Sequence, residues 1–231
     1  MKIKDLLTDE NTRLALEQVL NLSKPEILLN KDKELTKQEY KNYKKIIKQL
    51  NKGKPIQYIT HKAYFYNKEY YVNKNTLIPR PETEVLVNKT NELIKKHLKQ
   101  ENINILEIGT GTGIIPITLK HLNKNYTIVA TDISKKALKV AKKNQKTYNT
   151  DIIFIKTDLY KGINKKFDCI ISNPPYIEEN SKKIEKQVKE NEPKKALYGG
   201  KDGLDYYRKI LKDITNIINK KHIISFEIGE N

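Results

Sequence analysis

Apolar residues near the start of the chain recur at helical spacing. Leu16, Val19 and Leu20 follow the three- and four-residue periodicity of one helix face. The run Thr36-Lys37-Gln38-Glu39 forms a capping box, which predicts that a second helix begins there. The apolar face of this second helix carries Tyr40, Tyr43, Ile47 and Leu50. We therefore predict a helical module over residues 1–53, which either docks a substrate or partner or is only a packing appendage.

The pattern changes after Gly53. Aromatic residues alternate around Asn67-Lys68, and this predicts a β-hairpin within a connector over residues 54–78. The next run, Pro79-Arg80-Pro81-Glu82-Thr83-Glu84, is typical of a helix start, because Pro81 suits a first turn and the two acids suit its positive end. The apolar positions of that helix are Leu86, Leu93, Ile94 and Leu98.

Short apolar runs then alternate with amphipathic segments. The predicted strands cover residues 103–108, 127–131, 152–155, 167–172 and 223–228. The last strand follows an amphipathic helix that bears Ile210, Leu211, Ile214 and Ile218. Strands that alternate with helices indicate an α/β domain, over residues 79–231, whose parallel sheet is covered on both faces. Ligands of such sheets bind at the carboxyl ends of the strands.

Composition narrows this picture only slightly. The formal net charge of +17 favours a nucleic-acid partner, but the lysines are scattered and fit solvated helix faces better. The chain has neither the roughly 18 consecutive apolar residues of a membrane span nor a signal peptide, so we expect a cytoplasmic protein that does not contact membranes. Cys169 is the single cysteine, and the four histidines show no ligand spacing, so we expect no disulfide and no metal site.

A glycine-rich loop follows the first predicted strand of the sheet. Its sequence is Glu107-Ile108-Gly109-Thr110-Gly111-Thr112-Gly113, and glycine lets a ligand lie against the backbone. A dinucleotide site would place its third glycine at position 114, which is Ile, and a phosphate-binding loop would add a lysine. Glu107 would repel a pyrophosphate but suits a cationic ligand. The amino group of S-adenosylmethionine meets that demand, and we expect a water to bridge it to Glu107.

Acidic residues end the next two strands. Asp132 can accept hydrogen bonds from both hydroxyls of a ribose, a role that it would share with NAD-binding folds. Asp158 can accept from an adenine amino group, while Leu159 packs against the ring. The alternative interpretation is that these acids only cap the turns that follow them. Their order along the chain favours a cofactor site.

The run Asn173-Pro174-Pro175-Tyr176 follows the fourth strand, at the same edge of the sheet as the glycine loop. It could be only a stiff turn under an amphipathic side chain. An amide or adenine amino nitrogen is a poor nucleophile, because its lone pair is delocalised. The Asn173 side-chain oxygen and the Pro174 carbonyl can accept both N–H bonds and favour an electron-rich nitrogen in the transition state. Pro175 stiffens the turn, and Tyr176 offers a flat face to a planar group.

These motifs resemble the release-factor glutamine N5-methyltransferase family, also called the HemK/PrmC family. The resemblance also covers residues 54–59, the Pro79 to Glu84 run and residues 192–204. It implies a Rossmann-like class I S-adenosylmethionine-dependent methyltransferase with a small N-terminal helical domain. The implied reaction methylates the side-chain nitrogen of the glutamine in the Gly-Gly-Gln loop of a peptide-chain release factor, a step in translation termination.

Two departures and two alternatives accompany this resemblance. Family members often carry Trp where this chain has Leu159, and family chains continue beyond Glu227-Ile228-Gly229, so we expect a shortened sheet with reduced stability. An adenine-N6 methyltransferase acting on DNA or RNA would share Asn-Pro-Pro-Tyr. A non-catalytic protein with an S-adenosylmethionine fold would only bind a partner. The Pro79 to Glu84 run and the helical module favour the glutamine enzyme.

Overall fold

The computed structural model describes residues 1–229, and contacts divide the chain into a unit of Met1–His61 and a second unit that begins at Lys62. We describe each unit by itself. Residues 54–60, which we expected in the connector, include the short helix α5 (Ile56–Thr60). Ile56 and Ile59 pack against the apolar core of the first unit. This packing explains why the contact boundary falls later than position 53.

The first unit is entirely helical apart from one isolated bridge. Its core is formed by buried apolar side chains that include Leu16, Tyr43 and Leu50 from the two predicted helices. Thr36 caps the longest helix: the Glu39 backbone N–H donates to Thr36 Oγ1 (3.2 Å), and the Thr36 N–H donates to Glu39 Oε2 (2.7 Å). The capping box predicted from the sequence is therefore present. The remaining helices of this unit are α1 (Ile3–Leu6), α2 (Glu10–Leu20), α3 (Lys24–Leu29) and α4 (Lys37–Leu50).

The second unit opens with the hairpin of β1 (Lys62–Phe65) and β2 (Lys68–Tyr71). Its two-residue turn is Tyr66-Asn67, one position earlier than expected, and both residues have positive φ (54° and 56°). Such a turn matches the twist of the strands but strains a tyrosine. The Tyr66 N–H donates to Glu84 Oε1 (2.7 Å), and this bond helps to hold the turn.

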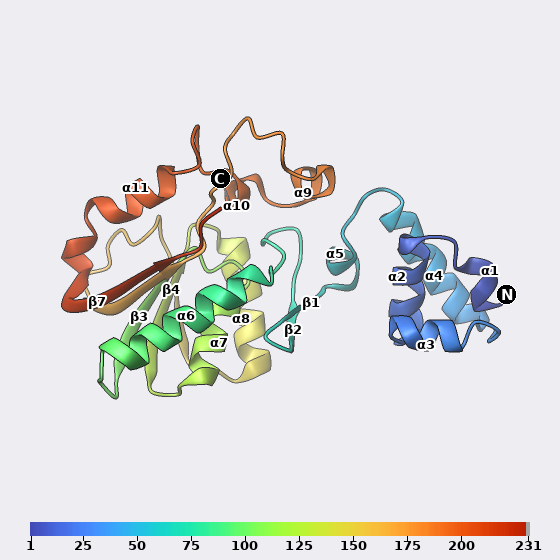
Figure 1. Cartoon of the computed structure of the whole chain (residues 1–231), viewed down its shortest axis with the longest axis horizontal. Coiled ribbons are helices and arrows are strands. Elements are labelled where there is room, and N and C mark those ends of the chain that lie inside the picture. The colour runs from blue at the N-terminus through green and yellow to red at the C-terminus, as the bar shows by residue number, and fades with distance from the viewer. Residues whose placement is uncertain (230–231) are drawn as a thin grey trace. The chain divides into compact units, whose positions relative to one another are not determined.

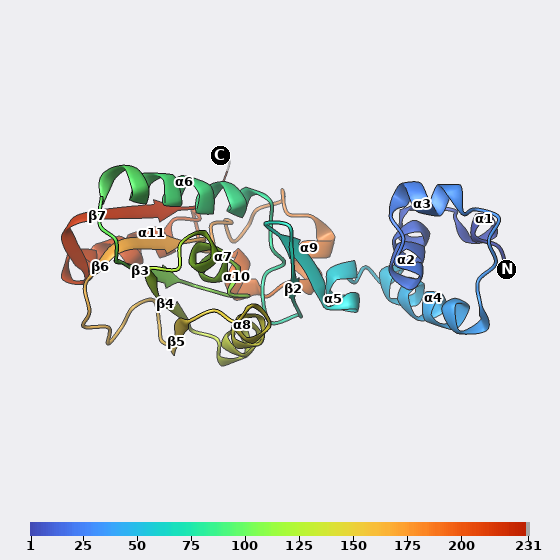
Figure 2. The ribbon, with the colours of Figure 1, turned by 90° about the horizontal axis from the view of Figure 1, so that it is seen from below.

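Five parallel strands form the central sheet, in the order β5-β4-β3-β6-β7. The three inner strands β3, β4 and β6 are mostly buried, as expected for strands covered on both faces, whereas the edge strands β5 and β7 are largely half-buried or exposed. Figure 2 shows β7 with α6 toward one side of the sheet and β5 with α8 toward the other. The strands are β3 (Ile103–Ile108), β4 (Tyr126–Asp132), β5 (Ile152–Lys156), β6 (Phe167–Ser172) and β7 (Ile218–Phe226).

Helices cover both faces of this sheet (Figure 1). On one face, α6 (Glu82–His97) and α7 (Ile114–Leu122) share a core with side chains such as Ile105 and Ile171. On the other face, α11 (Asp205–Lys212) and the 3₁₀ turn η1 (Ile214–Ile217) pack on Leu106 and Ile170. The remaining helices are α8 (Lys135–Tyr148), α9 (Lys186–Asn191) and α10 (Lys194–Leu197). The α/β fold class expected from the sequence is confirmed.

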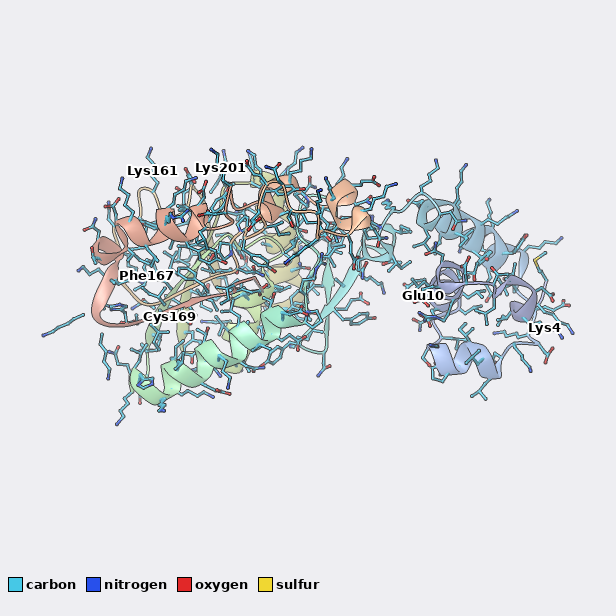
Figure 3. The ribbon with its side chains drawn as sticks, turned by 45° about the horizontal axis from the view of Figure 1, so that its top comes forward. Lys4, Glu10, Lys161, Phe167, Cys169 and Lys201 are labelled. Atoms are coloured by element: carbon cyan, nitrogen blue, oxygen red, sulfur yellow. The ribbon has the colours of Figure 1, made fainter. Side chains whose placement is uncertain are left out.

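Two further observations concern the described part of the chain. Cys169 lies on β6 within the second unit (Figure 3), and burial raises the pKa of its thiol. Among residues 1–229, no helix combines the length and the apolar character that crossing a membrane requires.

The last strand begins earlier than we predicted. Ile218, assigned from the sequence to the preceding helix, is the first residue of β7 and pairs with Phe167. The next pair in the register is Cys169 with Ile223, so residues 219–222 form an irregularity in the strand. Asn219 Nδ2 donates to Asp168 Oδ1 (2.7 Å) within this stretch. The start of the strand was not predicted, because the polar residues 219–222 interrupt its apolar pattern.

Candidate active site

A cavity of about 480 Å³ lies at the carboxyl ends of β3, β4, β5 and β6. This size is within the range of small-molecule sites. The cavity brings together most of the site residues predicted from the sequence, although they come from four different loops. These residues are Glu107, Gly109, Thr110, Gly111, Thr112, Asp132, Asp158, Leu159, Asn173, Pro174 and Pro175. Gly113 is the N-cap of α7, and Tyr176 lines a neighbouring cavity instead.

The glycine loop is held by the strand beside it. The backbone N–H groups of Gly109 and Thr110 both donate to Thr131 O (2.9 Å each). Gly109 and Gly111 have φ angles of +79° and +53°, and a Cβ on either would meet no atom within 4 Å. These glycines are therefore required by backbone conformation rather than by crowding within the protein. The loop consequently presents its backbone to open space in the cavity.

Glu107 is almost fully buried, with 1 % of its surface exposed. Among the described residues, neither Glu107 Oε2 nor the buried Thr110 Oγ1 has a hydrogen-bond partner of good geometry, although the Thr110 hydroxyl lies near enough to the carboxyl to oppose part of the rise in its pKa. Burial raises the pKa of Glu107 to about 8. A buried carboxyl oxygen without a partner is costly unless a ligand or water completes its bonding. These two oxygens therefore favour a polar ligand with hydrogen-bond donors, as the sequence suggested for Glu107.

Asp132 already accepts two hydrogen bonds from the backbone. Its Oδ2 accepts from the Gly111 N–H (2.9 Å) and its Oδ1 from the Ser134 N–H (2.7 Å). The second bond is the turn-capping role that we considered as an alternative. Burial raises the pKa of Asp132. Because each carboxylate oxygen has a second lone pair, Asp132 can cap the turn and still accept a ligand hydroxyl.

The loop after β5 places Asp158 and Leu159 at the edge of the cavity. Asp158 is exposed, whereas Leu159 is half-buried and packs against the core on the face of the sheet that α11 covers. Leu159 has a φ of +52°, which is rare for an apolar residue. Strain of this kind persists where the surroundings impose it, and it is frequent at binding sites. Leu159 is thus held as part of the cavity wall.

Asn173 is partly buried directly after β6. Its Nδ2 donates to Thr83 Oγ1 (3.1 Å), so the amide nitrogen is engaged within the protein. The amide oxygen is the end that can accept from a ligand. Asn173 also lines a second cavity, of about 360 Å³, together with Tyr176 and Ile177. The residue therefore stands where the two cavities meet.

A loop after α10 fixes the backbone of the Asn173 to Tyr176 turn. The Ile177 N–H donates to Leu197 O (3.0 Å), and the Gly199 N–H donates to Ile177 O (2.8 Å). A Cβ on Gly199 would lie 2.5 Å from both Pro175 O and Gly203 O. Only glycine allows this approach. The Leu197 to Gly203 segment is therefore the support against which the turn is packed.

Arg80 and Glu192 connect two further segments that the sequence singled out. Arg80 forms an ion pair with Glu192, whose side chain is 2 % exposed, and the Ile78 N–H donates to Glu192 Oε2 (3.0 Å). Arg80 Nη1 also donates to Ile78 O (2.9 Å). Arg80 lines both cavities. The Pro79 to Glu84 run, which we interpreted as a helix start, thus also forms part of the cavity wall.

Sequence reasoning did not identify Thr83, Glu227 or Asn144 as site residues. Thr83 Oγ1 donates to Glu227 Oε2 (2.7 Å). Asn144 Nδ2 donates to Thr112 O (2.9 Å) and thereby supports the glycine loop from α8. The position of Glu227 directly after β7 was an available signal, because polar residues at the carboxyl ends of parallel strands face the same edge. Nothing local in the sequence indicates the role of Asn144.

Solved structures share the architecture of the chain. A methyltransferase from Pyrococcus furiosus has a TM-score of 0.52 at 19% sequence identity and covers 72% of each chain. The catalytic domain of hMettl16, determined with MAT2A 3'UTR hairpin 6, has a TM-score of 0.52 at 17% identity over 70% of this chain and 62% of the other. Such low identities establish the fold alone.

Sequence comparisons identify the family. Residues 84–196 match a family model described as "Methyltransferase small domain", and residues 8–60 match "PrmC N-terminal domain". A release factor glutamine methyltransferase from Bacillus cereus is 40% identical over 226 residues, which cover 96% of this chain and 80% of that protein. Proteins of the same name from Streptococcus pneumoniae and Bacillus subtilis are 37% and 35% identical, over 95% and 96% of this chain and 78% and 79% of their own lengths. The resemblance stated from the motifs is confirmed, and the chain belongs to the release factor glutamine methyltransferase family.

Proposed function

We propose that this chain transfers a methyl group from S-adenosylmethionine to the side-chain amide nitrogen of a glutamine in a peptide-chain release factor. We further propose that the methylated residue is the glutamine of the Gly-Gly-Gln loop. The observation that carries the proposal is the position of Asn173 where two cavities meet. One cavity suits a cofactor, and the other suits a side chain of the substrate.

The first cavity has the donor and acceptor set that S-adenosylmethionine needs. Glu107 Oε2 is buried and, among the described residues, lacks a hydrogen-bond partner of good geometry, so a cationic amino group would complete its bonding. Asp132 retains lone pairs for ribose hydroxyls. Asp158 and Leu159 stand at the edge where an adenine could bind. When bound, the cofactor supplies an electrophilic methyl on a sulfonium.

The second cavity would admit the substrate side chain. Its wall is mixed: Tyr176, Ile177 and Leu197 supply apolar surface beside Asn173, and charged side chains complete the lining, namely Arg80, Glu178, Lys183 and Glu185. The Asn173 oxygen and the Pro174 carbonyl would accept the two N–H bonds of the glutamine amide. Holding both bonds favours a pyramidal nitrogen, and fixing the nitrogen near the methyl makes the reaction effectively unimolecular.

The proposed partner protein is a peptide-chain release factor. The names of the relatives support a release factor as substrate. The helical unit of residues 1–61 is our candidate for docking that protein, since residues 8–60 match an N-terminal domain model of the family. Nucleic acid as a partner is not favoured, and a cytoplasmic location stays a prediction.

The decisive experiment uses the purified chain, a purified release factor and S-adenosylmethionine labelled on its methyl group. Mass spectrometry of the digested release factor should find one added methyl on the peptide that contains the Gly-Gly-Gln loop. Fragmentation should place it on the glutamine. A release factor with that glutamine replaced by asparagine serves as the matched control, and it should remain unlabelled.

Two other results would identify the alternatives. Label in added DNA or RNA, with none in the release factor, would show an adenine methyltransferase. Binding of cofactor without transfer to either substrate would show a non-catalytic binding protein. Either result would overturn the proposed function.

A further inference from the structure

Three side chains form a hydrogen-bonded chain behind the reacting end of the site. Asn173 Nδ2 donates to Thr83 Oγ1 (3.1 Å), and Thr83 Oγ1 donates to Glu227 Oε2 (2.7 Å). An ionised carboxylate can only accept, and a hydroxyl carries a single proton. Once Thr83 gives that proton to Glu227, its oxygen can only accept from Asn173. Asn173 also donates directly to Glu227. The carboxylate therefore acts on the NH₂ end of the Asn173 amide both through Thr83 and by itself, and it determines which end of the amide faces Thr83.

Glu227 is well placed to hold this direction. It is 9 % exposed, and its N–H donates to Ser172 O (3.1 Å), so its backbone continues the sheet beside β6. The Tyr207 hydroxyl donates to Glu227 O (2.7 Å). The Tyr176 hydroxyl lies 3.5 Å from Glu227 Oε1. The Glu227 backbone is thus fixed by β6 and α11, and its carboxylate is held by Thr83 and by Tyr176 of the Asn173 to Tyr176 turn.

We propose that Glu227, acting mainly through the Thr83 hydroxyl and also on the Asn173 NH₂ group itself, is a positioning residue that keeps the oxygen of the Asn173 amide directed toward the substrate. This inference rests on the proposed function. In the opposite orientation, Asn173 would present its NH₂ group to the NH₂ group of the substrate amide. Two donors would then face each other, and the transition state would lose an acceptor.

The orientation should depend on the ionisation of Glu227. Burial raises the pKa of Glu227, and the nearby Glu82 of α6 adds to the rise, while hydrogen bonds from Thr83 and Asn173 oppose it. The other titratable groups that face it are Tyr176 and Tyr207. A protonated Glu227 could donate to Thr83, and Thr83 could then donate to the Asn173 oxygen. The transfer rate should therefore fall as the pH falls through this raised pKa.

Thr83 provides the most direct test, because valine has the same shape without the hydroxyl. Thr83→Val should lower kcat at saturating cofactor by about tenfold to a hundredfold, the scale expected for a misplaced reacting group. Thr83→Ser restores the hydroxyl and should restore most of the rate. Thr90→Val is the matched control. It removes a buried hydroxyl from the same helix, and that hydroxyl donates only to Leu86 O within the helix.

The second measurement follows the pH dependence of kcat. The kcat of the wild type should fall as the pH is lowered. The maximal kcat of Glu227→Gln should be lower, and the variant should not show this fall at acid pH. Binding of S-adenosylhomocysteine, measured by calorimetry, and the melting temperature should identify any variant that has merely lost its fold. If Thr83→Val fails to fold, Thr83→Ser still tests the role of the hydroxyl, because its kcat should stay close to that of the wild type.

The outcomes separate this inference from the function on which it rests. An active wild type with an equally active Thr83→Val, or an unchanged fall of kcat at acid pH in Glu227→Gln, would refute the relay and leave the proposed function standing. A wild type that binds cofactor but methylates no glutamine would overturn both. A specific loss of kcat in Thr83→Val, with retained cofactor affinity, is the expected result.

Discussion

The two halves of the active site are held together by different kinds of bond. In the cofactor half, Gly109, Thr110 and Gly111 donate backbone hydrogen bonds to the end of the adjacent strand β4. In the reaction half, side-chain bonds join residues far apart in sequence: Asn173 to Thr83 across 90 positions and Thr83 to Glu227 across 144. The first half follows mainly from one strand-loop-helix unit and its neighbouring strand, with one added side-chain bond from Asn144 of α8 to Thr112 O. The second exists only when distant segments meet.

This difference predicts that binding and transfer can be uncoupled. Damage to the reaction half should leave the glycine loop intact, because none of the bonds that tie the loop to β4 involves Asn173 or Thr83. Damage to the cofactor half should weaken binding while leaving the reacting turn in place. The following changes test that separation, from the largest expected effect to the smallest.

Replacing Asn173 with alanine should produce the largest effect. The variant loses an acceptor in the transition state, and the barrier should rise by about 2.7–4 kcal/mol, which is roughly a hundredfold to thousandfold in rate. Single-turnover transfer to a release factor measures this loss. The affinity for S-adenosylhomocysteine should stay near that of the wild type. A rate within about tenfold of wild type would show that Asn173 does not hold the substrate amide.

Replacing Gly199 with alanine should disturb the reaction half from outside the cavity. The new Cβ would lie 2.5 Å from Pro175 O and Gly203 O, so the backbone of the reacting turn must shift. Overpacking of this kind costs about 1–3 kcal/mol of stability, and we expect a lower melting temperature and a clearly lower kcat. Lys201→Ala is the control in the same loop, because Lys201 lies at the outer edge of the unit (Figure 3). Equal rates for the two variants would contradict this support role.

Replacing Asp132 with alanine should mainly weaken cofactor binding. The change removes the acceptor of the Gly111 N–H and the proposed acceptor of the ribose hydroxyls. Bonds to a charged group contribute about 1.5–3 kcal/mol each, so the dissociation constant should rise at least roughly tenfold. The rate at saturating cofactor should change far less. Asp151→Ala, at an exposed acid before β5, is the control and should bind like wild type.

The same contrast explains what could be predicted from the sequence. The strand β3 and the glycine loop were predictable, because a buried apolar run and its following glycines are local patterns. The relay from Glu227 to Asn173 was not, because its members have no periodic or spacing relation. Arg80 belonged to a predicted helix start, and Glu192 belonged only to a family motif. Their ion pair became apparent only when the fold placed the two segments together.

Errors in the predicted elements have a similar physical origin. Ile218 was assigned to a helix because Ile214 and Ile218 are four residues apart, yet Ile218 pairs with Phe167 in the sheet. The hairpin turn was placed one residue late, because a tyrosine at positive φ is intrinsically unfavourable. In both places tertiary contacts override the local preference. The hydrogen bond from Tyr66 to Glu84 is one such contact.

The smallest expected effect concerns Glu107 in the cofactor half. There, cofactor binding should be coupled to the release of a proton. The pKa of Glu107 is raised to about 8 in the folded chain, from an ordinary value of 4.5, because the carboxyl is buried. The folded chain therefore holds a proton that the unfolded chain releases between these values. Its contribution to stability should be complete below about pH 4.5 and should disappear as the pH rises through about 8.

A cationic amino group placed beside Glu107 should favour the ionised carboxylate and lower that pKa. Cofactor binding near pH 7 should then release a proton. Calorimetry in buffers of different ionisation enthalpy measures this release directly, and Glu107→Gln should abolish it. If wild type and Glu107→Gln release the same number of protons on binding, the amino group does not meet Glu107. The cofactor half would then need a different acceptor for that group, although the separation between binding and transfer would still hold.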